Sequence, residues 1–132
     1  MESTFTGDEA GQRKGSSIMK YIILTYETAD DFAARQDQER SERYWRNWAA
    51  FGGALKAAGA VAEMHGLRGV ETASTVRFRA GEKLVSNGPF TDGSIQLGGY
   101  FVIEANSEAE AQDWAAKSPA AAEGAVEVRL LL

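Results

Sequence analysis

The sequence predicts a single α+β domain, and three observations carry this prediction. Two runs rich in β-branched and aromatic residues, KYIILTY at 20–26 and QLGGYFVIE at 96–104, are typical of central strands. Apolar side chains from Tyr44 to Ala58 recur at helical spacing. At 132 residues, with 44% hydrophobic and 25% charged residues, the chain has the size and composition of one globular domain.

In the first half of the chain, a strand at Lys20–Tyr26 is followed by the polar and acidic segment Glu27–Arg40. We expect this segment to be a loop leading into a helix, and we expect the charges of the acidic run from Glu27 to Glu42 to form a solvated surface of weak ion pairs. The helix itself is predicted over 44–58. Gly52 and Gly53 lie inside it and cost about 1 kcal/mol each relative to alanine, so they indicate close packing against a neighbouring element.

In the second half, two apolar runs around a glycine turn predict a hairpin, and strands precede and follow it. A Ser-x-x-Glu capping box starts a second helix at Ser107. The predicted segments are a strand at Ala60–His65, the hairpin of Ser74–Arg79 with Lys83–Ser86, a strand at Gln96–Glu104, the helix after Ser107, and a strand at Ala125–Leu131.

The order of elements contains the β-α-β-β-α-β arrangement of ferredoxin-like folds, with an added hairpin. Two helices cover only one face of such a sheet. A second copy of the same sheet is the simplest cover for the other face, so we expect a homodimer.

Composition excludes several classes of protein. The chain has no cysteine and one histidine, which excludes a disulfide scaffold, a cysteine nucleophile and a multi-histidine zinc site within one chain. The net charge of −5 argues against nucleic acid as a partner, and no apolar run is long enough to span a membrane. With no phosphate-binding glycine motif either, we expect no metal and no other cofactor.

Residues 1–18 differ in composition from the rest and form an N-terminal arm or leader ahead of a domain at 19–132. They lack the apolar core of a secretory signal, and their acidic residues do not suit a transit peptide. We therefore expect a cytoplasmic protein. An arm that packs on a partner subunit is the alternative to an upstream leader.

The segments Asn87-Gly88-Pro89-Phe90 and Gln96-Leu97-Gly98-Gly99-Tyr100 resemble motifs of the YCII-related, or DGPF-domain, family. The opening MKYI at 19–22 and the closing VEVR at 126–129 add to the resemblance, which covers 19–132. It implies a dimeric α+β barrel but no settled reaction. Proposals for an active site come from relatives of the muconolactone-isomerase type.

The loop departs from the family pattern. Asn87 replaces the leading Asp, Asp92 lies where Glu is usual, and 93–95 replace Thr-Lys-Glu. An amide keeps the hydrogen-bonding shape of a carboxylate but cannot accept a proton in the same way. If the family's Asp is a base, this chain lacks it; if that Asp shapes the turn, Asn87 serves equally well.

His65 is the first candidate for acid–base catalysis, because only its side chain has an unperturbed pKa near neutrality. Glu63 lies on the same strand face and could pair with it. Asp92 is the second catalytic candidate, since it lies in a loop just ahead of a strong strand. A satisfied structural histidine and a turn-capping aspartate are the alternatives.

Four further residues are candidates for ligand binding. Aromatic side chains with a few polar groups are typical of small-ligand pockets, and an arginine on the hairpin could hold an anion. Core packing and a solvated strand face are the alternatives. Gly98-Gly99 indicates a bulge or a close backbone approach, and Phe90 is expected to plug the core. The four ligand candidates are Asn87, Tyr26, Tyr100 and Arg77.

Three functions remain open. The first is a metal-free enzyme of the isomerase or lyase type that carries out acid–base chemistry on a small organic acid in a dimer cleft. The second is a ligand-binding or regulatory module that acts with transcription-factor partners, as the family resemblance implies. The third is a degenerate, non-catalytic family member, which the altered loop makes credible.

Overall fold

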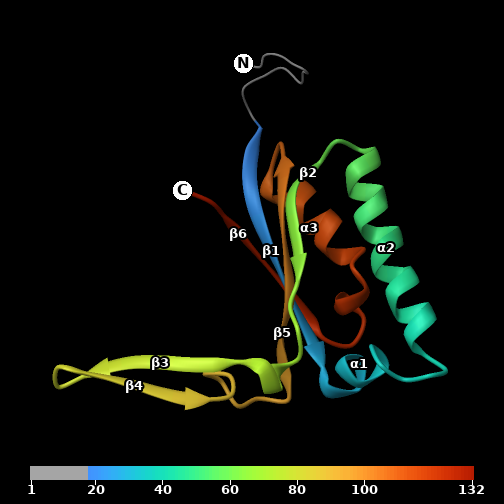
Figure 1. Ribbon diagram of the computed structural model, residues 1–132. Helices are drawn as coiled ribbons and strands as arrows, with labels where there is room; N and C mark the ends of the chain where they lie inside the picture. Colours follow the sequence, from blue (N-terminus) through green and yellow to red (C-terminus); the bar gives the residue numbers. More distant parts are fainter. Residues whose placement is uncertain (1–17) are drawn as a thin grey trace.

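A computed structural model describes residues 18–132, and in this range four strands form one antiparallel sheet in the order β2-β5-β1-β6 (Figure 1). The two apolar runs occupy its centre, as predicted. The strands are β1 (Met19–Thr28), β2 (Val61–Gly66), β5 (Ile95–Ala105) and β6 (Ala125–Leu130).

Alternation along β1 decides what each face of the sheet carries. Tyr21, Ile23, Thr25 and Glu27 are buried, whereas the residues between them are only half-buried. Because successive side chains of a strand point to opposite faces, these four side chains share one face. The fourth is a carboxylate, which is unusual on a buried face.

The helices of the described range cover that same face of the sheet (Figure 1). They are α1 (Ala29–Ala34), α2 (Ser41–Ala57) and α3 (Glu108–Ala116), with short 3-10 turns at Val70–Thr72 and Pro119–Ala121. The core between helices and sheet is built mainly from Tyr21, Ile23, Phe51, Leu55, Phe101, Ile103, Ala111 and Ala115.

The segment 27–40 differs from the prediction in two ways. It contains a helix, α1, whose first turn is capped by the Thr28 hydroxyl accepting from the Asp31 N–H. Its charges are also not all solvated. Glu27 is 2% exposed and the Arg35 side chain 12%, so the predicted solvated surface is wrong for this pair.

The predicted hairpin is confirmed and forms a separate two-stranded sheet, β3 (Ser74–Arg79) with β4 (Glu82–Asn87). Ala80 and Gly81 both have positive φ, as tight hairpin turns require. The hairpin projects from the sheet on the side away from α2 (Figure 1). Phe90, just beyond it, is 72% exposed, so the prediction that it plugs the core is wrong.

The α+β class is confirmed, with the hairpin inserted between β2 and β5. No helix in residues 18–132 is long and apolar enough to cross a membrane. The predicted N-terminal segment lies outside the described residues except for Ile18. The cytoplasmic location stays a prediction.

Candidate functional site: a cavity between helix α2 and the sheet

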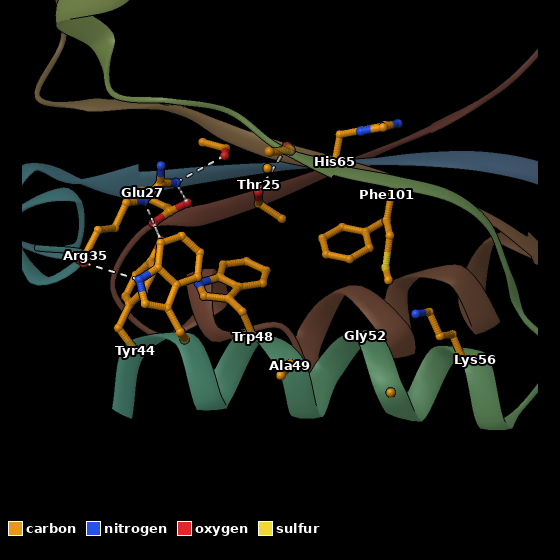
Figure 2. Close-up of a pocket in the computed structure, with 16 residues that line it drawn as sticks. Thr25, Glu27, Arg35, Tyr44, Trp48, Ala49, Gly52, Lys56, His65 and Phe101 are labelled. Atoms are coloured by element: carbon orange, nitrogen blue, oxygen red, sulfur yellow. Dashed lines mark hydrogen bonds and ion pairs between the residues drawn. The ribbon is translucent and has the colours of Figure 1, made fainter. Parts of the chain in front are cut away.

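A cavity of about 500 Å³ lies between α2 and the helix-covered face of the sheet (Figure 2). Its apolar wall includes Trp48 and Phe101, whose rings stack with centroids 5.9 Å apart. Met64 and the half-exposed Trp45 extend this wall. Volume and lining are those of a small-molecule site.

One end of the cavity holds a buried ion pair. Arg35 Nη2 donates to Glu27 Oε2 at 2.9 Å and to the Gly98 carbonyl at 3.2 Å. A second guanidinium N–H donates to the Leu67 carbonyl. A buried carboxylate is tolerated only when it is paired and hydrogen-bonded, and Arg35 meets both conditions for Glu27.

Tyr44, in the first turns of α2, completes this polar cluster (Figure 2). Its hydroxyl donates to Glu27 Oε1 and accepts from Arg35 Nε at 2.8 Å. The Arg35 guanidinium also lies over the rings of Phe32 and Tyr44, at 4.6 and 5.6 Å from their centroids. Glu27, Arg35 and Tyr44 are hereafter called the buried cluster.

The surroundings of the buried cluster change the pKa values of two of its side chains, Tyr44 and Arg35. Burial raises the pKa of Tyr44 well above its ordinary value of 10.0, and the hydrogen bond to Glu27 raises it further. Burial acts to lower the pKa of Arg35, but its hydrogen bond with Tyr44 and the charge of Glu27 outweigh that effect and raise it. Tyr44 is therefore a neutral phenol and Arg35 a permanent cation at neutral pH.

The glycine pair in β5 makes room for the buried cluster. A Cβ on Gly98 would lie 2.1 Å from Glu27 Oε2, which no side chain tolerates. A Cβ on Gly99 would lie 3.0 Å from the His65 carbonyl, and the Thr25 hydroxyl donates to the Gly99 carbonyl at 3.0 Å. The pairing of β1 with β5 shifts register here, which confirms the predicted bulge, and the short Cβ distances show that the backbones also approach closely.

Small residues of α2 face the middle of the cavity, and Lys56 lies at the far end from Tyr44 (Figure 2). Gly52 packs closely on Met64, since a Cβ there would meet its sulfur at 3.3 Å. A Cβ on Gly53 would meet nothing within 4 Å, so close packing explains only the first glycine of this pair.

The predicted catalytic histidine lies on the other face of the sheet. The backbone at His65 borders the cavity, but its imidazole points away from α2 (Figure 2). His65 Nε2 is 3.6 Å from Glu63 Oε2, which also accepts from the Tyr100 hydroxyl at 2.7 Å. This hydrogen bond raises the pKa of Tyr100. Glu63, His65 and Tyr100 are hereafter called the exposed cluster.

The other predicted site residues are scattered. Tyr26 shares the helix-free face with Tyr100, by the alternation of their strands. Asn87 ends β4, and Arg77 projects from β3 with its guanidinium 5.6 Å from the Phe90 ring centroid. Asp92 is exposed in the following loop. Within residues 18–132 no hydrogen bond or ion pair joins any of them to His65, and no three His, Asp or Glu side chains gather as metal ligands.

Sequence reasoning missed the buried cluster, although one signal for it was present. Tyr21, Ile23 and Thr25 alternate along β1, and continuing that period of two places Glu27 on the same buried face. A carboxylate at such a position needs a cationic partner. No comparable pattern points to Arg35, which reaches Glu27 only because α1 folds back beside the sheet.

Comparison with known proteins agrees with this architecture. The YCII-related domain matches residues 19–132. The chain is also 32% identical over 97 residues to "Uncharacterized protein R00369" of Rhizobium meliloti (strain 1021), a match that covers 74% of this chain and 77% of that protein. The chain therefore belongs to the YCII-related domain family.

Proposed function

We propose that this protein binds a small organic acid in the cavity beneath α2 and catalyses proton transfer on it. The observation that supports this proposal is the position of the buried cluster, at one end of an otherwise apolar cavity of about 500 Å³. Buried charges that converge on a cavity are frequent in functional sites.

The ends of the cavity suit an anionic ligand. Lys56 is about 18 Å along the helix axis from Tyr44, and it makes no ion pair with another residue of 18–132. Its ammonium is available to a carboxylate, while Trp48 and Phe101 contact the apolar body of the ligand. A small acid is shorter than this separation and does not contact both ends at once, so Lys56 attracts the anion to the cavity and the ligand reacts when it lies near Glu27.

The proposed chemistry needs no cofactor or second substrate. The Glu27 carboxylate accepts a proton from a carbon next to a carbonyl group of the ligand and returns it to another carbon, so the product is an isomer. Arg35 supplies the positive charge that pairs with the Glu27 carboxylate. The neutral Tyr44 hydroxyl donates a hydrogen bond to Glu27. During the reaction the same hydroxyl can donate instead to the negative oxygen that develops on the ligand.

Exchange of ligand hydrogen for solvent deuterium tests this chemistry. A panel of unsaturated and 2-oxo carboxylic acids is incubated in D2O with the protein, and loss of C–H signals is followed by proton NMR. We expect exchange with at least one acid and a loss of at least about 100-fold in Glu27→Gln. Glu63→Gln is the matched control and keeps the rate. Equal rates in wild type and Glu27→Gln would contradict the proposal.

A ligand-binding module is the second candidate, and one observation favours it. Both carboxylate oxygens of Glu27 already accept hydrogen bonds, from Arg35 and Tyr44, so the buried cluster is satisfied without turnover. A regulatory role with a transcription-factor partner would use the same cavity. Binding of an acid without deuterium exchange supports this candidate, whereas failure of the whole panel to bind supports a degenerate family member.

We also propose that two subunits pair through their helix-free faces to form a dimeric α+β barrel. Ile22, Leu24 and Val102 are half-buried on this face, which has no covering layer in residues 18–132. Sheets bury such a face against another layer. Light scattering after size exclusion tests the pairing, and a monomer at micromolar concentration would contradict it.

The candidates His65 and Asp92 stay predictions in this assembly, as do the ligand contacts of Asn87, Tyr26, Tyr100 and Arg77. The exposed cluster would then lie between the two sheets. Activity that survives in Glu27→Gln and disappears in His65→Ala would move the reaction from the cavity to this inter-sheet cleft.

A further inference from the structure

Trp48 presents a hydrogen-bond donor to the cavity. Its indole ring belongs to the apolar wall, and the ring nitrogen lies on the side toward Tyr44 (Figure 2). An indole N–H can donate a hydrogen bond but cannot accept one. Among the hydrogen bonds within residues 18–132, none uses the Trp48 N–H. A donor that faces a cavity without a protein acceptor indicates an acceptor on the ligand.

The other side-chain donors at this end of the cavity already have acceptors within residues 18–132, and they belong to Thr25, Arg35, Tyr44 and Trp45. Trp45 gives the closest comparison with Trp48, because its indole N–H donates to the Arg35 carbonyl at 3.2 Å. The Arg35 guanidinium itself donates four hydrogen bonds. Among the described residues at this end, Trp48 therefore holds the donor that is left for a ligand.

Aromatic packing fixes the position of this donor. The centroid of the Trp48 ring lies 6.5 Å from that of Tyr44, 6.1 Å from that of Phe51 and 5.9 Å from that of Phe101. Contacts with three rings hold the indole beside Tyr44, whose hydroxyl donates to Glu27. A donor that is held in place before the ligand arrives can stabilise a developing charge without reorganisation.

The proposed base determines what the Trp48 N–H can bind. When Glu27 removes a proton from C3 of a 2-oxo acid, the C–H electron pair forms a C2–C3 double bond and the carbonyl pair moves to the 2-oxo oxygen. That oxygen becomes negative and requires hydrogen-bond donors. The carboxylate of the ligand is repelled by Glu27 and points away from it along the cavity. The 2-oxo oxygen is then the ligand group beside Trp48.

We propose that the Trp48 indole N–H donates a hydrogen bond to the 2-oxo oxygen of the ligand, and that the cavity thereby selects 2-oxo acids. The inference rests on the proposed function and names the substrate class of the same cavity. The N–H binds the neutral ketone oxygen and binds it more strongly as negative charge develops. An acid without this oxygen would leave the N–H covered and unpaired, which disfavours its binding.

Isothermal titration calorimetry with matched acids tests this selection. The acids form pairs that differ only in the 2-oxo group, namely pyruvate with propanoate, 2-oxobutanoate with butanoate, and phenylpyruvate with 3-phenylpropanoate. For at least one pair, we expect the wild-type protein to bind the 2-oxo acid at least about tenfold more tightly. In Trp48→Phe the ratio of the two dissociation constants should fall to about one.

Trp45→Phe is the matched control. It makes the same substitution in the same wall, but the N–H that it removes already donates to the Arg35 carbonyl. The ratio of dissociation constants should therefore stay within about twofold of the wild-type ratio. Because the ratio compares two acids on one protein, a general change in affinity cancels.

A second measurement needs no variant with an altered cavity. Hydrogen bonding deshields the donated proton, so the indole N–H signal of Trp48 should move further downfield with the 2-oxo acid than with its partner. The Trp45 N–H keeps its protein acceptor and should respond alike to both acids. If Trp48→Phe does not fold, the wild-type ratio and the Trp48 shift decide the inference.

The outcomes separate this inference from the proposed function. A preference for the 2-oxo acid that Trp48→Phe abolishes and Trp45→Phe keeps supports the inference. Equal binding of both acids by the wild-type protein, or a ratio that changes no more in Trp48→Phe than in Trp45→Phe, overturns it. Deuterium exchange that depends on Glu27 would then still support the proposed function. Binding of no acid contradicts both. Far-UV circular dichroism verifies that each variant keeps the fold.

Discussion

The two faces of the sheet carry the same pair of groups in different surroundings. On the helix-covered face Tyr44 donates to Glu27, and on the helix-free face Tyr100 donates to Glu63 at 2.7 Å. Glu27 is 2% exposed, whereas Glu63 is largely open to solvent. Both pairs are a tyrosine hydroxyl that donates to a glutamate. A difference between the effects of mutating the two pairs is therefore due to their difference in burial.

The cation beside each carboxylate differs in the same way. Arg35 is a permanent cation that binds Glu27 at 2.9 Å, while His65, 3.6 Å from Glu63, is charged only when protonated. A buried carboxylate needs a permanently charged cation beside it, because no water can take the place of a cation that loses its charge. An exposed carboxylate does not. The comparison therefore predicts large effects on one face and small effects on the other.

Arg35→Met gives the largest expected effect. It leaves Glu27 buried without a counter-charge, which costs about 3–5 kcal/mol in the free energy of unfolding. Urea denaturation followed by circular dichroism measures this loss. His65→Ala is the counterpart on the exposed cluster and should leave the midpoint unchanged. Equal effects would contradict the distinction between the faces.

Gly98→Ala comes next. The new Cβ would lie 2.1 Å from Glu27 Oε2, so the carboxylate must move away from Arg35. Losing charge-assisted hydrogen bonds in this way costs about 2–3 kcal/mol. Gly66→Ala is the control, because a Cβ there meets nothing within 4 Å. The midpoint of thermal unfolding is compared for the two variants. A Gly98→Ala protein as stable as Gly66→Ala would show that the Glu27 carboxylate can move without loss of stability.

Tyr44→Phe and Tyr100→Phe form a matched pair. The first removes the hydroxyl that donates to Glu27 and accepts from Arg35, which costs about 1–3 kcal/mol. The second removes a solvent-exposed hydrogen bond and should give no measurable change. Chemical denaturation of both proteins at pH 7 provides the measurement. A larger loss in Tyr100→Phe would reverse the assignment of the buried and exposed clusters.

Alkaline pH should give the smallest effect. The pKa of Tyr44 is raised in the folded state, so above the ordinary tyrosine value of 10.0 the folded protein keeps a proton that the unfolded chain loses. Stability contributed by Tyr44 is complete below pH 10 and is lost as pH rises, by less than about 1.4 kcal/mol per pH unit. Between pH 9.5 and about 11, the free energy of unfolding should fall less steeply with pH in Tyr44→Phe than in the wild-type protein. An unchanged slope would contradict the raised pKa.

The fold could be predicted further than the site. Apolar runs in β1 and β5 identified the central strands, and the Ser107 capping box identified α3, where the Ser107 hydroxyl accepts from the Glu110 N–H. Such signals are local, because periodicity and caps lie within one segment. Helix α1 was missed because its six residues are too few for a helical apolar period to be recognised.

The buried cluster could not be predicted in full, because its members come from three segments that meet only in the folded chain. Tyr44 was assigned to the apolar face of a helix, and the close approach at Gly98 was predicted without the group that approaches. Glu27 and Arg35 were assigned to solvated surface, since charged residues are rarely buried. Only the pairing of the two makes their burial possible.

Indole N–H resonances test the central claim, that the cavity beneath α2 is a ligand site, most directly. The chain has three tryptophans: Trp45 and Trp48 line the cavity, whereas Trp114 on α3 packs elsewhere on the core. During titration with the panel of carboxylic acids, we predict saturable shifts of the Trp45 and Trp48 indole signals for at least one acid, with Trp114 unchanged. Shifts confined to Trp114, or none with any acid, would contradict the claim.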